Sequence, residues 1–244
     1  MFFNTMNTKF YVTKLRDVKL PSRANSTDAG CDCYIPAVDD HFLEDLYCLN
    51  VKNGTSFYIN LHCEVNNQKF VETISFKNVE EYEKVYGNEN TDRETIAQLL
   101  HNNLMITLLE NHIDIHEINP KDVNFYYTFT LPAHSRVLIP GGIKVTLFPK
   151  NSCLDVCNKS GVATKNGLIY TCHIIDSFYT GEVCYGVANV SDKDVTLIPE
   201  TKLVQVIHIP VFISTPEEVP IEVYDYLTKN SDRGVGGFGS SGLK

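Results

Sequence analysis

The stretch Arg136-Val137-Leu138-Ile139-Pro140-Gly141-Gly142-Ile143-Lys144-Val145-Thr146-Leu147-Phe148 shows the pattern that decides the fold. Two short runs rich in apolar and β-branched residues flank a Pro-Gly-Gly turn signal. Because strands favour such residues and tight turns favour glycine and proline, the stretch predicts two strands joined by a turn.

Similar runs recur throughout residues 126–211, at Gly167–Ile175, Val183–Val190 and Leu203–Ile209. Short strands at regular spacing are typical of an all-β sandwich or barrel. Residues 8–36 add alternating apolar positions and a turn-rich segment, so we assign 8–39 and 126–230 to one β core, with 212–230 as a linker at its end.

The middle of the chain, residues 40–125, has a different pattern and predicts a mixed α/β insertion. A capping box begins at Thr91, and apolar residues then recur at every fourth position, which predicts an amphipathic helix over about 91–112. A shorter helix is expected at Val79–Tyr86. Three strands are expected, at Tyr47–Val51, Ser56–Glu64 and Lys69–Phe76.

The apolar stripe of that helix needs a surface to cover it, and we expect the insertion's own strands to provide one. The insertion contains no acid/base or ligand constellation, so we expect it to lie outside a catalytic pocket and to leave the β core intact. Its polar face is then available to a protein partner, which is the one route to a regulatory role.

Composition excludes several classes of protein. A formal net charge of −9 over 244 residues argues against stable nucleic-acid binding through a broad basic face, but a local cluster of donors still permits a nucleotide ligand. No apolar stretch approaches the roughly 18 residues of a membrane span. The first residues lack a signal-peptide pattern, so we expect a cytoplasmic protein whose eight cysteines are reduced thiols, and the Cys31/Cys33 and Cys153/Cys157 spacings disfavour zinc.

The C-terminal tail, residues 231–244, combines groups that suit a nucleotide. Its glycines leave backbone N–H groups free to surround phosphate oxygens, Arg233 adds a fork of charged donors, and Phe238 offers a flat face for a base. Composition alone favours a disordered end. A dinucleotide-binding Gly-x-Gly-x-x-Gly is excluded, because only five residues follow Gly239 and no βαβ unit can form.

Two internal segments also carry candidate groups. Asp176 follows a β run, where a carboxylate can accept a proton from water, although a turn-capping aspartate is the commoner case. Lys159, Ser160 and Gly161 join a cation, a hydroxyl and a glycine, which fits either a phosphate contact or a surface turn.

These pieces, taken in order, resemble the trimeric dUTP diphosphatases (dUTPases). The resemblance covers about 8–36 and 128–244 and leaves the insertion unmatched. It rests on five ordered motifs: Asp28-Ala29-Gly30-Cys31-Asp32-Cys33, Lys159-Ser160-Gly161-Val162-Ala163, Ile175-Asp176-Ser177-Phe178-Tyr179-Thr180-Gly181-Glu182, Lys202-Leu203-Val204-Gln205-Val206-Ile207, and Arg233-Gly234-Val235-Gly236-Gly237-Phe238-Gly239-Ser240-Ser241-Gly242.

The resemblance implies a β-barrel or jelly-roll core, a homotrimer whose tail is a flexible arm closing over a neighbour's site, and hydrolysis of dUTP to dUMP and diphosphate. It implies that Asp176 activates water, that Tyr179 packs under the deoxyribose, and that Asp32 binds Mg²⁺ through water. Phosphate and base contacts would come from Lys159, Ser160, Gly161, Thr171, His173, Ile175, Gln205, Arg233, Phe238, Gly239, Ser240 and Ser241.

Three departures from the family pattern bear on specificity. Lys159 replaces an arginine, so a bidentate phosphate contact becomes a point charge, and Asn158 replaces the proline before it. Thr171-Cys172-His173 stands where small, glycine-containing turns usually approach the base, which puts uracil selectivity in question. Two alternatives stay open: a related dCTP-processing enzyme, and a nucleotide-switched regulatory protein that uses the insertion to bind a partner.

Overall fold

The computed structural model describes residues 8–50, 55–76, 96–114 and 122–231. The chain divides into two units, Met1–Val211 and Phe212–Lys244, which we treat separately. Within the described part of the chain, no helix is long and apolar enough to span a membrane.

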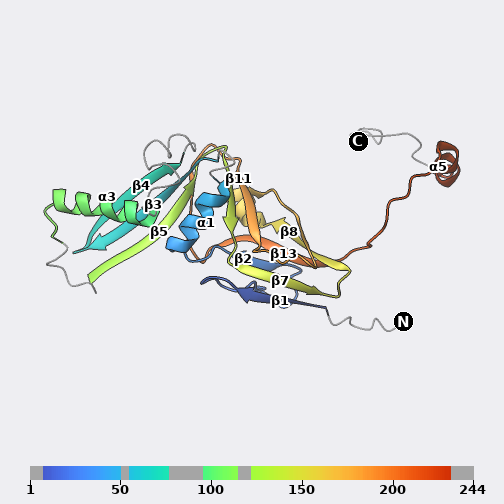
Figure 1. The fold of residues 1–244 in the computed structure, drawn as a ribbon, viewed down its shortest axis with the longest axis horizontal. Helices are drawn as coiled ribbons and strands as arrows, with labels where there is room; N and C mark the ends of the chain where they lie inside the picture. The colour runs from blue at the N-terminus through green and yellow to red at the C-terminus, as the bar shows by residue number, and fades with distance from the viewer. Residues whose placement is uncertain (1–7, 51–54, 77–95, 115–121, 232–244) are drawn as a thin grey trace, which may run out of the picture. The chain divides into compact units, whose positions relative to one another are not determined.

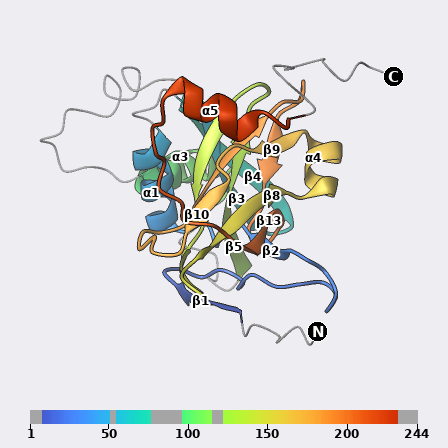
Figure 2. The same cartoon turned by 90° about the vertical axis from the view of Figure 1, so that its right-hand side faces the viewer.

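Two sheets form the β core (Figures 1 and 2). The first has the order β10-β8-β13-β2 and the second the order β6-β11-β9, with antiparallel pairing throughout. Their buried side chains, such as Val156 and Tyr185, belong to one hydrophobic cluster. The strand bounds are β2 Cys31–Tyr34, β6 Arg136–Pro140, β8 Ser152–Asn158, β9 Leu168–Tyr170, β10 Ile174–Asp176, β11 Cys184–Asn189 and β13 Lys202–Pro210.

A two-stranded sheet flanks this core, where β1 (Lys9–Lys14) pairs antiparallel with β7 (Ile143–Phe148). The turn between β6 and β7 is the predicted Pro-Gly-Gly segment. Gly142 has φ +72°, a left-handed conformation that glycine adopts without strain. The predicted all-β core is therefore confirmed. The two strands predicted within residues 136–148 are β6 and β7, which are joined by this turn.

A further sheet, with the order β12-β5-β3-β4, connects the insertion to the core. Its strands are β3 (Phe57–Val65), β4 (Gln68–Phe76), β5 (Val123–Leu131) and β12 (Val195–Leu197). Alternate residues of β3 are buried, as expected for a strand with one covered face. Because β5 spans the predicted boundary at residue 125, the insertion's strands extend a sheet that also contains core strands.

The covering element is α3, Ile96–Glu110, which buries Leu100, Leu104 and Leu108 and packs against β4, β3 and α1 (Figure 1). The predicted helix is thus confirmed over its described part, and so is its cover by the insertion's own strands. The capping box at Thr91 and the helix expected at Val79–Tyr86 lie outside the described residues.

Three local predictions were wrong. Tyr47–Val51 is not a strand, because α1 extends over Asp40–Asn50 and begins where Asp39 Oδ1 accepts a bond of 2.8 Å from the Phe42 N–H. The run at 167–175 is split into β9 and β10 by residues 171–173. The segment 212–230 is not only a linker, since it contains α5, Ile221–Thr228. A short apolar run fits both the helical period of 3.6 residues and the strand period of 2 residues, so helix caps and tertiary contacts decided which element formed.

The side chain of Asn50, at the end of α1, protects the edge of the β6-β11-β9 sheet. Its Nδ2 donates to the carbonyl oxygens of Leu46 and Leu138, both at 2.7 Å, and its Oδ1 accepts from the Leu138 N–H at 2.7 Å. Asn50 is 1% exposed. An amide side chain therefore replaces the neighbouring strand that edge strand β6 lacks at Leu138.

We predict that Asn50→Ala lowers the free energy of unfolding by about 2–4 kcal/mol, because it leaves the partly buried backbone N–H and carbonyl groups of Leu138 unpaired. Asn111→Ala is the matched control, since Asn111 Nδ2 also donates to an i−4 carbonyl at 2.7 Å but is exposed. Urea denaturation at equal protein concentration measures both. Equal losses for the two variants would show that the edge contact adds nothing.

Candidate active site

Asp32 lies at the centre of a cluster formed by three separate segments of the chain. Its Oδ1 accepts a bond from Lys159 Nζ at 2.8 Å, and its Oδ2 pairs with Lys202 Nζ at 2.7 Å. The Asp32 side chain is 7% exposed, whereas those of Lys159 and Lys202 are 31% and 39% exposed. Two ammonium groups thus face solvent above one buried carboxylate.

The pairing of β13 with both β2 and β8 creates this cluster. Burial alone would raise the pKa of Asp32, but the hydrogen bonds and charges of Lys159 and Lys202 outweigh it and lower that pKa. The carboxylate therefore stays ionised, and the cluster keeps a net positive charge suited to anionic ligands, although the formal net charge of the chain is −9.

Gln205 lies beside this cluster, in register with Asp32 on β2 and Cys157 on β8. Its Nε2 donates to the Asn158 carbonyl at 3.0 Å. A Cβ at Gly30 would come within 2.7 Å of Gln205 Oε1, so the glycine leaves room for this amide. Asn158 Oδ1 in turn accepts the Tyr170 N–H at 2.5 Å, so the Asn158 side chain has a structural role.

Ser160 and Gly161 begin α4 (Ser160–Asn166) directly after Lys159, and both are exposed. No atom lies within 4 Å of a Cβ built on Gly161, so the space beside it is open. These residues are accessible to a ligand next to Lys159.

The loop 171–173 joins β9 in one sheet to β10 in the other, and all three of its side chains are exposed. The Thr171 N–H donates to the Gly186 carbonyl at 2.9 Å, and the His173 carbonyl accepts the Val156 N–H at 2.7 Å. The loop is therefore fixed to both sheets. Ile175, in β10 beyond this loop, is buried at 8% exposure and pairs with Leu154 of β8, so its side chain is not open to a ligand.

Asp176 and Tyr179 form a second group at the end of β10. Asp176 is exposed, and its carbonyl accepts the Tyr179 N–H at 3.1 Å across a turn. The Tyr179 hydroxyl donates to the Glu182 carbonyl at 2.9 Å, and its ring lies so close to Gly181 that a Cβ there would meet Oη at 2.6 Å. Burial, aided by nearby acidic groups, raises the pKa of Tyr179, so the phenol stays protonated.

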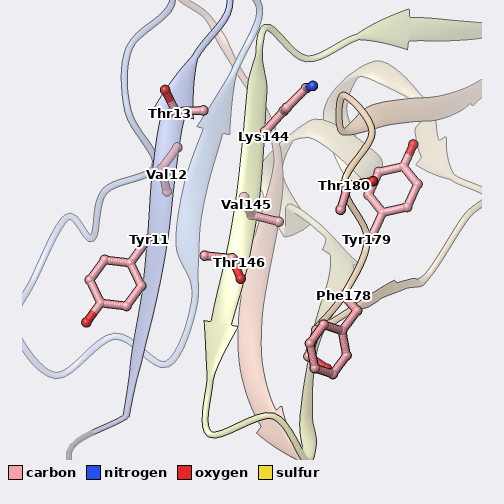
Figure 3. Close-up of a pocket in the computed structure, with 10 residues that line it drawn as sticks. Tyr11, Val12, Thr13, Lys144, Val145, Thr146, Phe178, Tyr179 and Thr180 are labelled. Carbon is pink, nitrogen blue, oxygen red and sulfur yellow. The ribbon is translucent and has the colours of Figure 1, made fainter.

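A mostly apolar groove of about 360 Å³ runs beside this turn, between residues 177–180 and strands β1 and β7 (Figure 3). Tyr11 and Val145 line it from the strands, and Phe178 and Tyr179 line it from the turn. Lys150 Nζ lies 5.0 Å from the centre of the Phe178 ring, on which it exerts a cation–π attraction.

The two groups do not meet within one chain. Gln205 pairs with Cys157 on β8, while Asp176 pairs with Cys153 four residues along the same strand. At about 3.3 Å per residue this offset alone separates the groups by about 13 Å. Lys159 and Gln205 therefore belong to one partial site, and Asp176 and Tyr179 belong to another.

Comparison with known proteins identifies the family. The sequence profile of the dUTPase family matches residues 121–242. A deoxyuridine 5′-triphosphate nucleotidohydrolase of Orientia tsutsugamushi (strain Boryong) is 36% identical over 113 residues, which are 46% of this chain and 72% of the relative. The chain belongs to the dUTPase family. A Candida albicans nucleotidohydrolase of the same name is 32% identical over 113 residues, covering 46% of this chain and 68% of the relative.

Solved structures extend the likeness of fold to the insertion. The dUTPase of Staphylococcus bacteriophage 80alpha, solved with dUPNHPP, aligns with 96% of this chain and 99% of its own length, at a TM-score of 0.52 and 15% identity. At that identity the likeness concerns the fold alone, and it confirms the predicted dUTPase-like β core.

The family profile covers residues 121–242 and therefore does not include Asp32. The contacts of Asp32 are known from the structure alone. It places Asp32 against Lys159 and Lys202, two residues inside the matched region. Lys202 was missing from the predicted site, although it opens a predicted motif and its charge was a usable signal. Arg233, Phe238, Gly239, Ser240 and Ser241 lie outside the described residues.

We predict that Asp32→Asn flattens the acid dependence of stability. The lowered pKa means that Asp32 stabilises the fold above its ordinary pKa of about 4, and that this contribution is lost as pH falls through the depressed value. The difference in unfolding free energy between wild type and Asp32→Asn should therefore shrink toward low pH. Glu218→Gln, at an exposed residue, should follow wild type. A difference that stays constant with pH would contradict the prediction.

Proposed function

We propose that this chain hydrolyses dUTP to dUMP and diphosphate, with Asp176 as the base that activates the attacking water. The supporting observation is the pair of partial sites in a dUTPase-family chain: an exposed carboxylate on one, and a solvent-facing lysine pair on the other. An exposed aspartate at a strand end has the access to water that general base catalysis requires.

The phosphates bind the lysine side of the site in this proposal. Lys159 and Lys202 supply point charges, and Ser160, Gly161 and Gln205 supply hydroxyl, backbone and amide contacts. The tail completes the grip through Arg233, Ser240 and Ser241, with Gly239 allowing close approach and Phe238 covering the base. Positioning and charge neutralisation provide most of the catalysis in such substitutions at phosphorus.

The sugar and base bind the other partial site. Tyr179, anchored on the Glu182 carbonyl, packs under the deoxyribose and leaves no room for a 2′-hydroxyl. Thr171 and His173 and the backbone of Ile175 contact the base. Because Thr171 and His173 are larger than the glycines usual at this turn, base selectivity needs measurement with each deoxynucleoside triphosphate.

The residues present fit a magnesium ion that arrives with the triphosphate. Asp32 is an ionised carboxylate beside the proposed phosphate site, and it would accept a hydrogen bond from a metal-bound water at an oxygen that pairs with a lysine here. Within residues 8–50, 55–76, 96–114 and 122–231, no group of three or more His, Cys, Asp or Glu side chains is placed to bind a metal directly. Bound there, Mg²⁺ would supply neutralisation of the phosphate charge, and Asp32 would hold one of its waters.

We further propose that the complete site forms between copies of the chain in a homotrimer. The offset of about 13 Å along β8 between the register positions of Gln205 and Asp176 keeps the two groups apart in one chain, and in this proposal a neighbouring chain supplies the missing half. The core 8–39 and 126–230 carries both halves, the arm 231–244 closes them, and the insertion 40–125 lies outside the site, where it is free to contact a protein partner.

Replacing Asp176 by Asn tests the base. We expect turnover of dUTP to fall about 10²–10⁴-fold, the usual worth of a general base, while an imido analogue still binds within a few-fold of wild type. Asp192→Asn controls for loss of a surface charge. Stopped-flow diphosphate release and calorimetry supply the two measurements, and near-normal turnover would remove Asp176 from this role.

Deleting residues 231–244 tests the arm. The described strands end before this segment, so we expect a folded trimer that retains little activity, because the tail's phosphate contacts are gone. Sedimentation confirms assembly, and the same release assay gives the rate with each deoxynucleoside triphosphate. Full activity in the truncated protein would show that the arm takes no part.

A further inference from the structure

Arg16 is a buried arginine that joins three distant segments of the chain. Its side chain is only 4% exposed, and Nη2 lies 2.6 Å from Asp45 Oδ2 and 3.0 Å from Glu182 Oε2. Arg16 follows β1, Asp45 belongs to α1 of the insertion, and Glu182 follows the Asp176–Tyr179 turn. One guanidinium therefore connects the insertion to the partial site that holds Tyr179.

The surroundings hold this guanidinium tightly. Its central carbon lies 5.8 Å from the centre of the Phe42 ring, and a Cβ at Gly142 would come within 2.7 Å of Arg16 Cγ. Nε and Nη1 are buried without a hydrogen-bond partner among the described residues. Burying unpaired N–H groups costs stability, and apolar side chains often replace buried ion pairs without loss, so the arrangement favours a positional role for this charge.

Glu182 contacts both Arg16, through its side chain, and Tyr179, through its backbone carbonyl. Oε2 of Glu182 pairs with Arg16, and Oε1 accepts the Gly142 N–H at 2.7 Å, so both carboxylate oxygens are fixed. The backbone carbonyl of the same residue accepts the Tyr179 hydroxyl at 2.9 Å. The phenol therefore has its anchor on a residue whose own side chain is held by Arg16.

We propose that Arg16 is a positioning residue that sets the Tyr179 ring through Glu182, and that Asp45 makes this setting depend on the insertion. The inference rests on the proposed function, in which Tyr179 packs under the deoxyribose. Without Asp45, Arg16 keeps one carboxylate partner in place of two, so the balance of forces that fixes Nη2 between Asp45 and Glu182 is lost. Glu182 and the Tyr179 ring then shift with it, and the site admits a 2′-hydroxyl more readily.

The test compares Asp45→Asn with Glu44→Gln, a neighbouring change on α1 with the same loss of charge. Glu44 Oε1 accepts the Ile96 N–H at 3.2 Å, so this control perturbs the insertion without removing an Arg16 partner. The readout is the ratio of kcat/KM for dUTP to that for UTP. We expect Asp45→Asn to lower this ratio about tenfold, since displacements of about 1 Å at a site cost up to 10²-fold, whereas Glu44→Gln keeps it.

Asp45→Glu, which restores the carboxylate, should recover most of the ratio. Arg16→Lys should lower it, because the shorter lysine side chain does not bring its nitrogen to the position of Nη2 between the two acids. Thermal unfolding of each variant separates a simple loss of stability from a loss of selectivity. If Arg16→Lys does not fold, the Asp45 series alone decides. An unchanged ratio in Asp45→Asn, in a wild-type background that turns over dUTP, overturns the proposal.

A binding measurement separates this outcome from failure of the proposed function. Calorimetry with the non-hydrolysable imido analogues of dUTP and UTP gives the selectivity ratio without turnover. If wild type does not hydrolyse dUTP, the proposed function fails, and the ratio of analogue affinities still tests the positioning role. Equal affinity ratios for wild type and Asp45→Asn would then reject it.

Discussion

The pairing of β13 with β8 on one side and β2 on the other is the constraint on which the candidate site depends. It places Gln205 in register with Asp32 and Cys157, and it brings Lys202 and Lys159 to opposite oxygens of one carboxylate. Residues from positions 32, 159 and 202 become neighbours only because backbone hydrogen bonds align their strands. The lysine pair is thus a product of sheet register.

The same sheet explains why a single chain carries two partial sites. β8 pairs with β13 along its length and with β10 at its start, so Asp176 lies at one end of the strand and Lys159 follows the other. An extended strand cannot fold back to join them. This separation is the observation on which the proposed shared site of a homotrimer rests.

The insertion is integrated into the core by polar groups as well as by packing. The Asn50 side chain hydrogen-bonds to the edge strand β6, and the Asp45 carboxylate pairs with Arg16. Strand β5 pairs with β12 of the core on one side and with β3 of the insertion on the other. The Asn50 and Asp45 side chains each satisfy a buried polar group that would otherwise be costly.

The sequence by itself determined the β core, the α3 helix with its buried leucines, and the ordered motifs that indicate the dUTPase family, because residue periodicity and turn chemistry act locally. It did not reveal that Tyr47 lies in a helix, because a short apolar run fits both a helix and a strand. The cap at Asp39 and the packing of Phe42 and Leu46 select the helix. The Lys202 contact, the offset between Asp176 and Lys159, and the burial of Arg16 were decided by tertiary structure alone. Each of them depends on which strands pair and in what register, and contacts between residues far apart in the sequence make that choice.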